Sequence, residues 1–455
     1  MAYMVKLDDI RLENIKNVVN GRIKIVGAGK NKCDIIGIYG QNGTGKTAII
    51  DGMEIIQELM TGNSLGLKFF DSLYIGASES VIETGFTVDV GDKKYKAEYK
   101  VVIKFNETQT DYFIARESLK CVGIGDGSGE YVKCDFENPD AIISPKKNEE
   151  RIISRDGRLR RELYARKVVA RETRASFIFS KGDEAALTGR NLNEGIFDVI
   201  KVLKKYANID LFVIKNSNSG VISLNQLIPF SFRIENGEAR TVKGEAGIRL
   251  DGPTLVSIDR YKDINMLLAQ LNLVVKCIVP DLQLCIKEYG EQADESGGSR
   301  MRFELLTRRG NSYLPLRSES EGIKKIISIL SALVSFYNRE SATVLIDELD
   351  AGIFEYLLGE LLSVLDDNAR GQLIFTSHNL RPIEVLDRRN IYFTTCNPKN
   401  RYIQLKNVKG AVNLRDFYYR SIELGGQRER LYDEADLSGL ALALRLAGGY
   451  MKYEG

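Results

Sequence analysis

Apolar residues recur with two different periods along the chain, and the two periods predict different elements. Short continuous apolar runs at residues 34–39, 344–346 and 373–376 are typical of strands buried on both faces of a sheet. Residues 81–90 and 95–105 instead alternate between apolar and polar positions around a short turn, which predicts an antiparallel hairpin or meander. The chain is therefore expected to combine buried strands with an antiparallel sheet.

Helical periods separate these strands. An apolar residue at every third or fourth position predicts helices over residues 48–60, 185–206, 264–279 and 326–337. A strand-like run at residues 211–214 lies between the two middle helices. No heptad repeat persists in that region, so we expect a compact insertion there and not a long coiled coil.

A glycine-rich segment, Gly40 to Thr47, joins the first buried strand to the first predicted helix. Its glycines allow the backbone to curl so that several N–H groups point at phosphate oxygens, and the helix aims its positive end at the same place. Lys46 would reach the β- and γ-phosphates, and the Thr47 hydroxyl would ligate Mg²⁺. The alternative is a glycine-rich turn with a chance lysine, but strand, loop and helix stand in the order that a phosphate loop requires.

Polar residues follow the two other buried strands. Asp347 suits a Mg²⁺ ligand held through water, and Glu348 could orient and deprotonate an attacking water. His378, the only histidine of the chain, follows the strand at residues 373–376. Taken alone, the two carboxylates could be an acidic cap and the histidine could be structural. Because ligands of open α/β sheets bind at the carboxyl ends of the strands, we expect all three segments to meet at one edge.

Composition and charge narrow the class of protein further. The six cysteines show no metal-ligand spacing, and reduced thiols are the simplest interpretation. No apolar run is long enough to span a bilayer and no signal peptide is evident, so we expect a cytoplasmic protein. The net charge of +2 creates no overall basic field. The basic cluster at residues 146–174 could contact nucleic acid, but it could equally be a solvated helix face or a partner surface.

These segments together resemble the ABC-type ATPases of the SMC/RecF/OLD-like branch. Gly40 to Thr47 is similar to their Walker A, Val344 to Glu348 to their Walker B, and Leu349 to Gly352 to their D-loop. His378 stands where this family keeps a switch histidine, which senses the γ-phosphate. The glutamine with which the family usually senses Mg²⁺ is missing between residues 61 and 83.

The family also carries a signature in which a serine and a glycine open a helix. Ser320 and Gly322 resemble it, although Glu321 replaces the first glycine of the transporter-type signature. Ser320 could also be an ordinary helix cap, and the two interpretations are compatible because a capped helix N-terminus is itself an anion site.

The resemblance implies a set of site residues. Those expected to bind the nucleotide are Asn42, Gly43, Thr44, Gly45, Lys46, Thr47, Ser320, Gly322 and Asp350; those expected to hold the metal are Thr47 and Asp347; and those expected to act in catalysis are Glu348 and His378.

The implied fold is an α/β P-loop NTPase of the ABC ATPase head type, with an antiparallel β subdomain and a mainly helical insertion. Residues 1–165 would form the first lobe of the head, with Walker A and the antiparallel subdomain. Residues 166–300 would form the insertion, a partner or output region. Residues 301–455 would form the second lobe, with the signature, Walker B, D-loop, switch histidine and C-terminal tail.

The family implies a function as well. Its signature meets the nucleotide of a second subunit, so a homo-oligomer, at least a dimer, would hold ATP and Mg²⁺ between chains and act as a conformational switch. Chains of this size without a fused nuclease resemble ATPase subunits of bacterial anti-phage systems, such as the PARIS system, which control a separate effector such as a nuclease. Alternatives are a RecF-like DNA-repair ATPase and a slowly hydrolysing nucleotide-gated scaffold. The degenerate signature and the large insertion disfavour a transporter engine.

Overall fold

The computed structural model describes fifteen stretches of the chain. They are residues 3–25, 34–74, 76–125, 127, 129–138, 141–144, 150, 157–180, 194–216, 220–222, 224–236, 240–293, 298–406, 413–434 and 436–450. All residues predicted for the site lie within them, whereas part of the basic cluster at residues 146–174 lies outside them.

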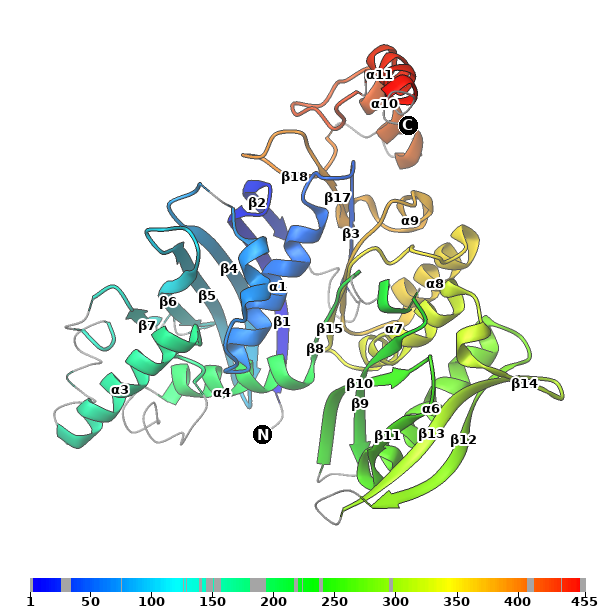
Figure 1. The fold of residues 1–455 in the computed structure, drawn as a ribbon. Helices are drawn as coiled ribbons and strands as arrows, with labels where there is room; N and C mark the ends of the chain where they lie inside the picture. Colours follow the sequence, from blue (N-terminus) through cyan, green and yellow to red (C-terminus); the bar gives the residue numbers. More distant parts are fainter. Residues whose placement is uncertain are drawn as a thin grey trace.

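An antiparallel sheet of six strands forms one side of the molecule (Figure 1). Its order is β2-β1-β4-β5-β6-β7, with bounds Val18–Lys24, Tyr3–Ile15, Ser80–Val90, Lys93–Phe105, Tyr112–Gly123 and Gly129–Asp135. The hairpin predicted from alternating residues is confirmed, because β4 and β5 pair antiparallel from Ser80 opposite Ile103 to Val90 opposite Lys93.

The second sheet has six strands in the order β18-β17-β3-β16-β15-β8. Their bounds are Tyr402–Ile403, Ile391–Thr394, Asp34–Tyr39, Gln372–Thr376, Thr343–Ile346 and Leu211–Ile214. Strands β17, β3, β16, β15 and β8 pair in parallel, and β18 is antiparallel to β17. Parallel strands bring their carboxyl ends to one edge. The glycine-rich loop follows β3 of this sheet, and the antiparallel sheet lies beside it. This arrangement confirms the predicted α/β head fold.

The parallel sheet separates two apolar cores because successive side chains of a strand point to opposite faces. Ile36 and Ile38 of β3 pack into the core shared with the antiparallel sheet, with α1 (Lys46–Met60) and with α4 (Glu194–Ile209). Ile35 and Tyr39 face the other core, which contains α6 (Ile258–Ile278), α7 (Glu321–Asn338) and α8 (Glu355–Asn368). Figure 1 shows α1 between the two sheets. The helix after the glycine-rich loop is therefore held on both sides.

The segment at residues 166–300 contains strands as well as the predicted helices. It includes the C-terminal part of α3 (Gly157–Thr173) and all of α4 and α6, but also β8, the β9–β10 hairpin (Leu227–Asn236 and Arg240–Arg249), β11 (Thr254–Ser257) and β12 (Leu282–Ala293). Strands β11 and β12 flank β13 (Ser299–Arg309), which also pairs with β14 (Ser312–Pro315). The mainly helical expectation thus describes only part of this segment; β11 is four residues long, which is too short for a clear period.

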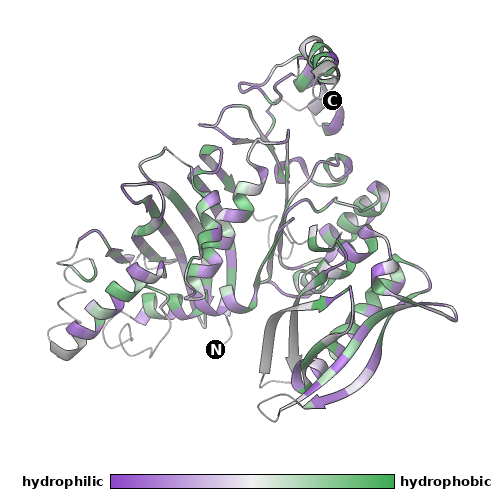
Figure 2. Cartoon of the chain, viewed as in Figure 1, coloured by the Kyte–Doolittle hydropathy of each residue, from purple (hydrophilic) through white to green (hydrophobic). Residues whose placement is uncertain are grey.

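The C-terminal region lies beyond the β17–β18 end of the parallel sheet (Figure 1), and its helix α10 (Leu414–Glu423) contacts β17. The region also contains α9 (Arg381–Val385) and α11 (Leu437–Tyr450). Short 3₁₀ turns occur at Leu67–Ser72, Leu316–Ser318 and Arg388–Asn390. The Tyr418 ring of α10 stacks on Phe393 with centroids 4.5 Å apart, which anchors this region. Apolar residues run along α11 (Figure 2), but among the described residues we find no helix long and apolar enough to cross a bilayer.

Candidate functional site

The glycine-rich loop adopts the curled backbone that phosphate binding requires. Gly40, Gly43 and Gly45 have φ angles of 150°, 77° and 89°, a region that side chains other than glycine rarely adopt. A Cβ atom at Gly40 would also lie 1.8 Å from the Thr394 hydroxyl oxygen. The loop ends at Gly45, directly before α1, so the first N–H groups of this helix open toward the loop. Asn42 and Gly43 are exposed, and Thr44 is buried.

Lys46 folds back over its own loop. Its Nζ atom donates to the carbonyl oxygens of Gly40 at 2.8 Å and Gln41 at 3.1 Å. Burial lowers the pKa of Lys46, while the charges of Glu348, Asp347 and Asp350 act in the opposite direction. The ammonium group is therefore held over the loop by carbonyl oxygens that a phosphate could replace as hydrogen-bond acceptors.

Thr47 and Asp347 lie together although 300 positions separate them. The Thr47 hydroxyl donates to Asp347 Oδ1 at 3.2 Å, and the Thr376 hydroxyl donates to the same oxygen at 2.7 Å. Asp347 directly follows β15, Thr376 ends β16, and Thr47 opens α1 after β3. Three neighbouring parallel strands thus deliver these oxygen atoms to one edge.

Glu348 occupies a strained backbone conformation beside this group. Its φ angle is 48°, which is uncommon for a residue that is not glycine. Its N–H donates to the Thr376 hydroxyl at 2.7 Å, and its Oε2 accepts from Asn216 Nδ2 at 2.6 Å. Its Oε1 lies 3.9 Å from His378 Nε2. The hydrogen bond from Asn216 orients the carboxylate, as a general base requires.

Asp350 connects the loop after β15 to the loop after β16. Its Oδ2 accepts from the backbone N–H groups of His378 at 3.1 Å and Asn379 at 2.9 Å. Its Oδ1 is buried and has no hydrogen-bond partner among the described residues. The imidazole of His378 is left half-exposed beside Glu348. The fold therefore brings Asp347, Glu348, Asp350 and His378 to the phosphate loop.

Ser320 and Gly322 lie at the N-terminus of α7. The Ser320 hydroxyl caps the helix by accepting from Ile323 N–H at 3.3 Å, and this is the side-chain hydrogen bond that the structure records for it. Gly322 is buried against Gly352 of the predicted D-loop, where a Cβ atom would lie 1.9 Å from the Gly352 oxygen. Both Ser320 and Glu321 are exposed. The capped end of α7 faces outward.

Three residues near the site were missed from the sequence. Asn216 lies in the segment predicted as the insertion, Thr376 ends a predicted strand, and Lys325 directly precedes the helix predicted over residues 326–337. Lys325 is buried; burial lowers its pKa, and Asp347, Glu348 and Asp350 act in the opposite direction. For Asn216 a signal existed, because a polar residue closely follows the apolar run of β8, as Asp347 follows β15. Asn216 lies beside Glu348. Its side-chain amide is therefore a candidate for the role of the Mg²⁺-sensing glutamine that is missing between residues 61 and 83.

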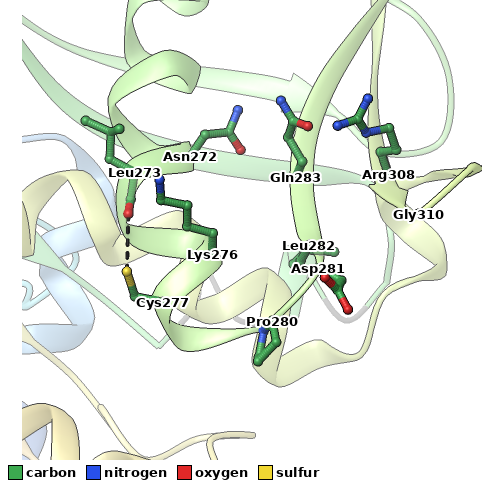
Figure 3. A pocket seen from close by; sticks show the side chains of 10 residues that line it. All are labelled: Asn272, Leu273, Lys276, Cys277, Pro280, Asp281, Leu282, Gln283, Arg308 and Gly310. Carbon is green, nitrogen blue, oxygen red and sulfur yellow. Dashed lines mark hydrogen bonds between the residues drawn. The ribbon is translucent and has the colours of Figure 1, made fainter.

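A cavity beside β12 is unrelated to these residues (Figure 3). It has a volume of about 800 Å³ and lies between the end of α6 and strands β12 and β13. Lys276, Cys277 and Arg308 are among its lining residues, and the Cys277 thiol donates to the Leu273 carbonyl oxygen at 3.5 Å. None of the residues predicted for the site lines it.

Several side chains of the basic cluster are engaged within the fold. Lys167 Nζ is buried and donates to the carbonyl oxygens of Asn138 and Ala141, each at 2.6 Å. Arg174 pairs with Asp111 at 2.5 Å, and Arg166 pairs with Glu162 at 2.8 Å. Lys167 is therefore withdrawn from solvent, whereas Arg174 and Arg166 form part-exposed ion pairs.

Known structures that resemble the chain are heads of SMC proteins and RecF. A structure of the Smc head bound to the C-winged helix domain of ScpA is 12% identical, with 88% of this chain and 98% of that chain covered and a TM-score of 0.40. The SMC head domain from Thermotoga maritima is 13% identical, with 88% and 99% covered and a TM-score of 0.37. The recombination mediator RecF with ATP is 12% identical, with 83% and 94% covered and a TM-score of 0.34.

No curated protein matches the chain. A protein-family model described as "AAA domain, putative AbiEii toxin, Type IV TA system" matches residues 146–382, which is more than half of the 455 residues. The matched part contains Ser320, Gly322, Glu348 and His378, whereas the phosphate loop precedes it. The chain belongs to this AAA domain family.

Proposed function

We propose that the chain binds ATP at the loop from Gly40 to Thr47 and hydrolyses it as a conformational switch between two subunits. The observation that carries the proposal is the contact of the Thr47 hydroxyl with Asp347 Oδ1 at 3.2 Å, with Glu348 beside it. Residues that the sequence separates by 300 positions meet at the loop that would hold the phosphates. If Asp347 and Glu348 were only an acidic cap on a core strand, Asp347 would not need to contact Thr47.

The oxygen atoms of Thr47 and Asp347 suit Mg²⁺. Among the described residues, no group of three or more histidines, cysteines or carboxylates could enclose a metal ion. A site with one hydroxyl and one carboxylate fits Mg²⁺, which keeps several waters and shares its coordination with substrate phosphates. When bound, this ion would neutralise charge on the β- and γ-phosphate oxygens.

The residues of the chain have separable roles in this proposal. Lys46 would exchange the Gly40 and Gln41 carbonyl oxygens for phosphate oxygens. Glu348 would accept the proton of the attacking water while Asn216 keeps its carboxylate oriented. The imidazole of His378 lies beside Glu348, where it would contact the γ-phosphate.

The outward-facing end of α7 supports a site shared between two copies. Ser320 and the first N–H groups of α7 form an exposed anion-binding end, and Ser320 has no recorded hydrogen bond to its own phosphate loop. In a two-fold pair, this end would meet the nucleotide of the other subunit. The nucleotide would join the subunits, and hydrolysis would release them.

We further propose that the switch serves a bacterial anti-phage system of the PARIS type and controls a separate effector. The family description, which names a toxin of a Type IV TA system, supports a role in a multi-protein defence system. The RecF-like alternative depends on DNA binding by the basic cluster. Of this cluster, Lys167 is buried and bonded within the fold, so that alternative depends on the other cations.

The test of the activity is Glu348→Gln, which keeps the shape of the side chain and removes the base. We expect kcat for ATP hydrolysis to fall about 10²–10⁴-fold while ATP binding persists, because general-base catalysis contributes about that factor. Lys46→Ala is the matched comparison and should abolish or greatly weaken binding. Unchanged steady-state turnover in Glu348→Gln would falsify the base assignment.

The proposed role in defence is tested by identifying the binding partner of the chain, either an effector protein or DNA. Co-expression with the protein encoded by a neighbouring gene should give a stable complex that changes with ATP. Tight DNA binding that weakens steeply with salt, without such a complex, would favour the repair alternative.

A further inference from the structure

Asp51 is a fully buried carboxylate that has no part in the chemistry proposed above. It lies on α1, five residues after Lys46, and its side chain has 0% exposure. Each of its two oxygens faces a different lysine. Lys16 Nζ forms an ion pair with Oδ2, and Lys215 Nζ lies 2.6 Å from Oδ1. Lys16 comes from the turn between β1 and β2, and Lys215 directly follows β8.

Each of these lysines is followed by an asparagine that contacts the candidate site. Asn17 Nδ2 donates to the Gly43 carbonyl oxygen of the phosphate loop. A Cβ atom at Gly45 would lie 2.8 Å from Asn17 Oδ1, so Asn17 packs closely against this loop. On the other side, Asn216 Nδ2 donates to Glu348 Oε2 at 2.6 Å. Two lysines from distant parts of the chain therefore meet at one buried carboxylate, and each precedes an asparagine that contacts the candidate site.

We propose that Asp51 is a positioning residue that holds Asn17 against the phosphate loop and Asn216 against the catalytic carboxylate, by way of Lys16 and Lys215. The proposal rests on the proposed ATPase function, because it gives a purpose to the contacts of both asparagines. It assigns a role in ATP binding to Lys16 and Asn17, and a role in turnover to Lys215 and Asn216.

Burial makes Asp51 the fixed point of this network. A charge with no access to water is costly unless it is paired, so the carboxylate holds both ammonium groups close to it. The lysines are less constrained, since their side chains are 35% and 30% exposed. Without Asp51 they could turn toward water, and the adjacent asparagines would lose their anchor.

The two arms of the network differ in strength. Lys215 also lies 3.0 Å from Glu54 Oε2, and Glu54 in turn pairs with Lys68 at 2.7 Å. Partial burial lowers the pKa of Lys215, but Asp51 and Glu54 outweigh this effect and the net shift is upward. For Lys16, the pair with Asp51 is the ion pair that the described residues record. Loss of Asp51 should therefore affect the Lys16 arm more strongly.

The test separates the two arms by kinetics. We expect Lys16→Met to weaken ATP binding about tenfold with kcat nearly unchanged, and Lys215→Met to lower kcat about tenfold with ATP affinity nearly unchanged, since supporting residues typically contribute 10–100-fold. Asp51→Asn should impair both constants, and adding Glu54→Gln should lower its kcat further. Identical effects of the two lysine substitutions on both constants, or wild-type constants in Asp51→Asn, would overturn the proposal.

The matched control is Glu117→Gln, which alters a buried carboxylate of β6 far from the site in sequence. Glu117 accepts from the Ser176 hydroxyl and from the Phe177 and Ile178 N–H groups. This variant should lose thermal stability and keep both kinetic constants. Loss of both constants in this control as well would mean that general destabilisation explains the Asp51 result.

A readout without nucleotide separates this proposal from the proposed function. In Asp51→Asn, hydrogen exchange should increase in peptides covering residues 14–20 and 212–216 and stay unchanged at residues 114–122. If the wild type shows no ATP binding or turnover, the proposed function fails, and increased exchange would still establish the positioning role. Unchanged exchange in both peptides would refute it.

Discussion

Thr376 links the two acidic residues of the site through a single hydroxyl group. This group donates to Asp347 Oδ1 at 2.7 Å and accepts from the Glu348 N–H at 2.7 Å. It is fully buried, so water cannot replace either bond. The hydroxyl therefore holds the carboxylate proposed to bind Mg²⁺ and the strained Glu348 backbone in one arrangement.

Thr376→Val keeps the shape of this side chain and removes both hydrogen bonds. We expect kcat for ATP hydrolysis to fall about 10–100-fold, as for other groups that orient a catalytic ligand. Stability should fall by about 1–3 kcal/mol, because a buried N–H and a carboxylate oxygen each lose a partner. Steady-state kinetics and thermal denaturation measure the two effects.

Thr376→Ser is the control, since it restores the hydroxyl and removes a methyl group. It should keep most of the turnover. If the valine variant turned over ATP like the wild type, the role assigned to this hydroxyl would be wrong.

At the scale of elements, the backbones of α7 and the loop after β15 approach so closely that a Cβ atom at Gly322 would clash with the Gly352 oxygen. Gly322 and Gly352 face each other, and Gly352 has a φ angle of 74°. The contact joins the helix that carries Ser320 to the loop that carries Asp350. A shift of α7 must therefore move this loop.

Gly322→Ala would place a methyl carbon 1.9 Å from the Gly352 oxygen, so the backbone must move. We expect a stability loss of about 1–3 kcal/mol from overpacking. Turnover should fall at least about tenfold through displacement of Asp350, since misplacement by about 1 Å can cost 10²-fold. ATP affinity should change little, because the phosphate loop is untouched; calorimetry and turnover assays check these outcomes.

Gly66→Ala is the matched control, because its φ angle is −76° and no atom lies within 4 Å of the added carbon. It should match the wild type in stability and turnover. A Gly322→Ala variant with normal turnover would show that the close contact does not position the loop.

At the scale of the whole molecule, a nucleotide site shared between two subunits predicts that two inactive variants can restore activity when they are mixed. Ser320→Arg should bind ATP and lose hydrolysis, because its own phosphate loop is intact and its bulky cation would block the site of the partner. Lys46→Ala has the opposite defect. Mixing the two variants should restore part of the activity, since one composite site would combine an intact loop with an intact α7 end.

Turnover of the mixture, compared with each variant alone, measures this complementation. Exchange of subunits must be demonstrated in the same sample, for example with differently tagged chains. No gain under those conditions would indicate that each site is built within one chain.

The sequence by itself determined the elements whose signals are local. The run of β3, the glycines at 40, 43 and 45, and the helix of α1 follow one another directly, and each has a pattern that needs no distant partner. The antiparallel pair β4 and β5 was predictable for the same reason, because alternation and a turn specify a hairpin. Lys46 followed from its place in the glycine-rich loop, and Asp347 and His378 from their places after strand ends.

Only the tertiary structure decided which distant residues join them. Strand β8 is four residues long and lies in a segment that reads as an insertion, so its place beside β15 depends on parallel pairing across more than 130 positions. That pairing places Asn216 against Glu348, and the packing of α1 between the sheets places Asp51 between Lys16 and Lys215. Local patterns record periodicity and turns, whereas long-range strand pairing and buried charge are satisfied only when the whole chain has folded.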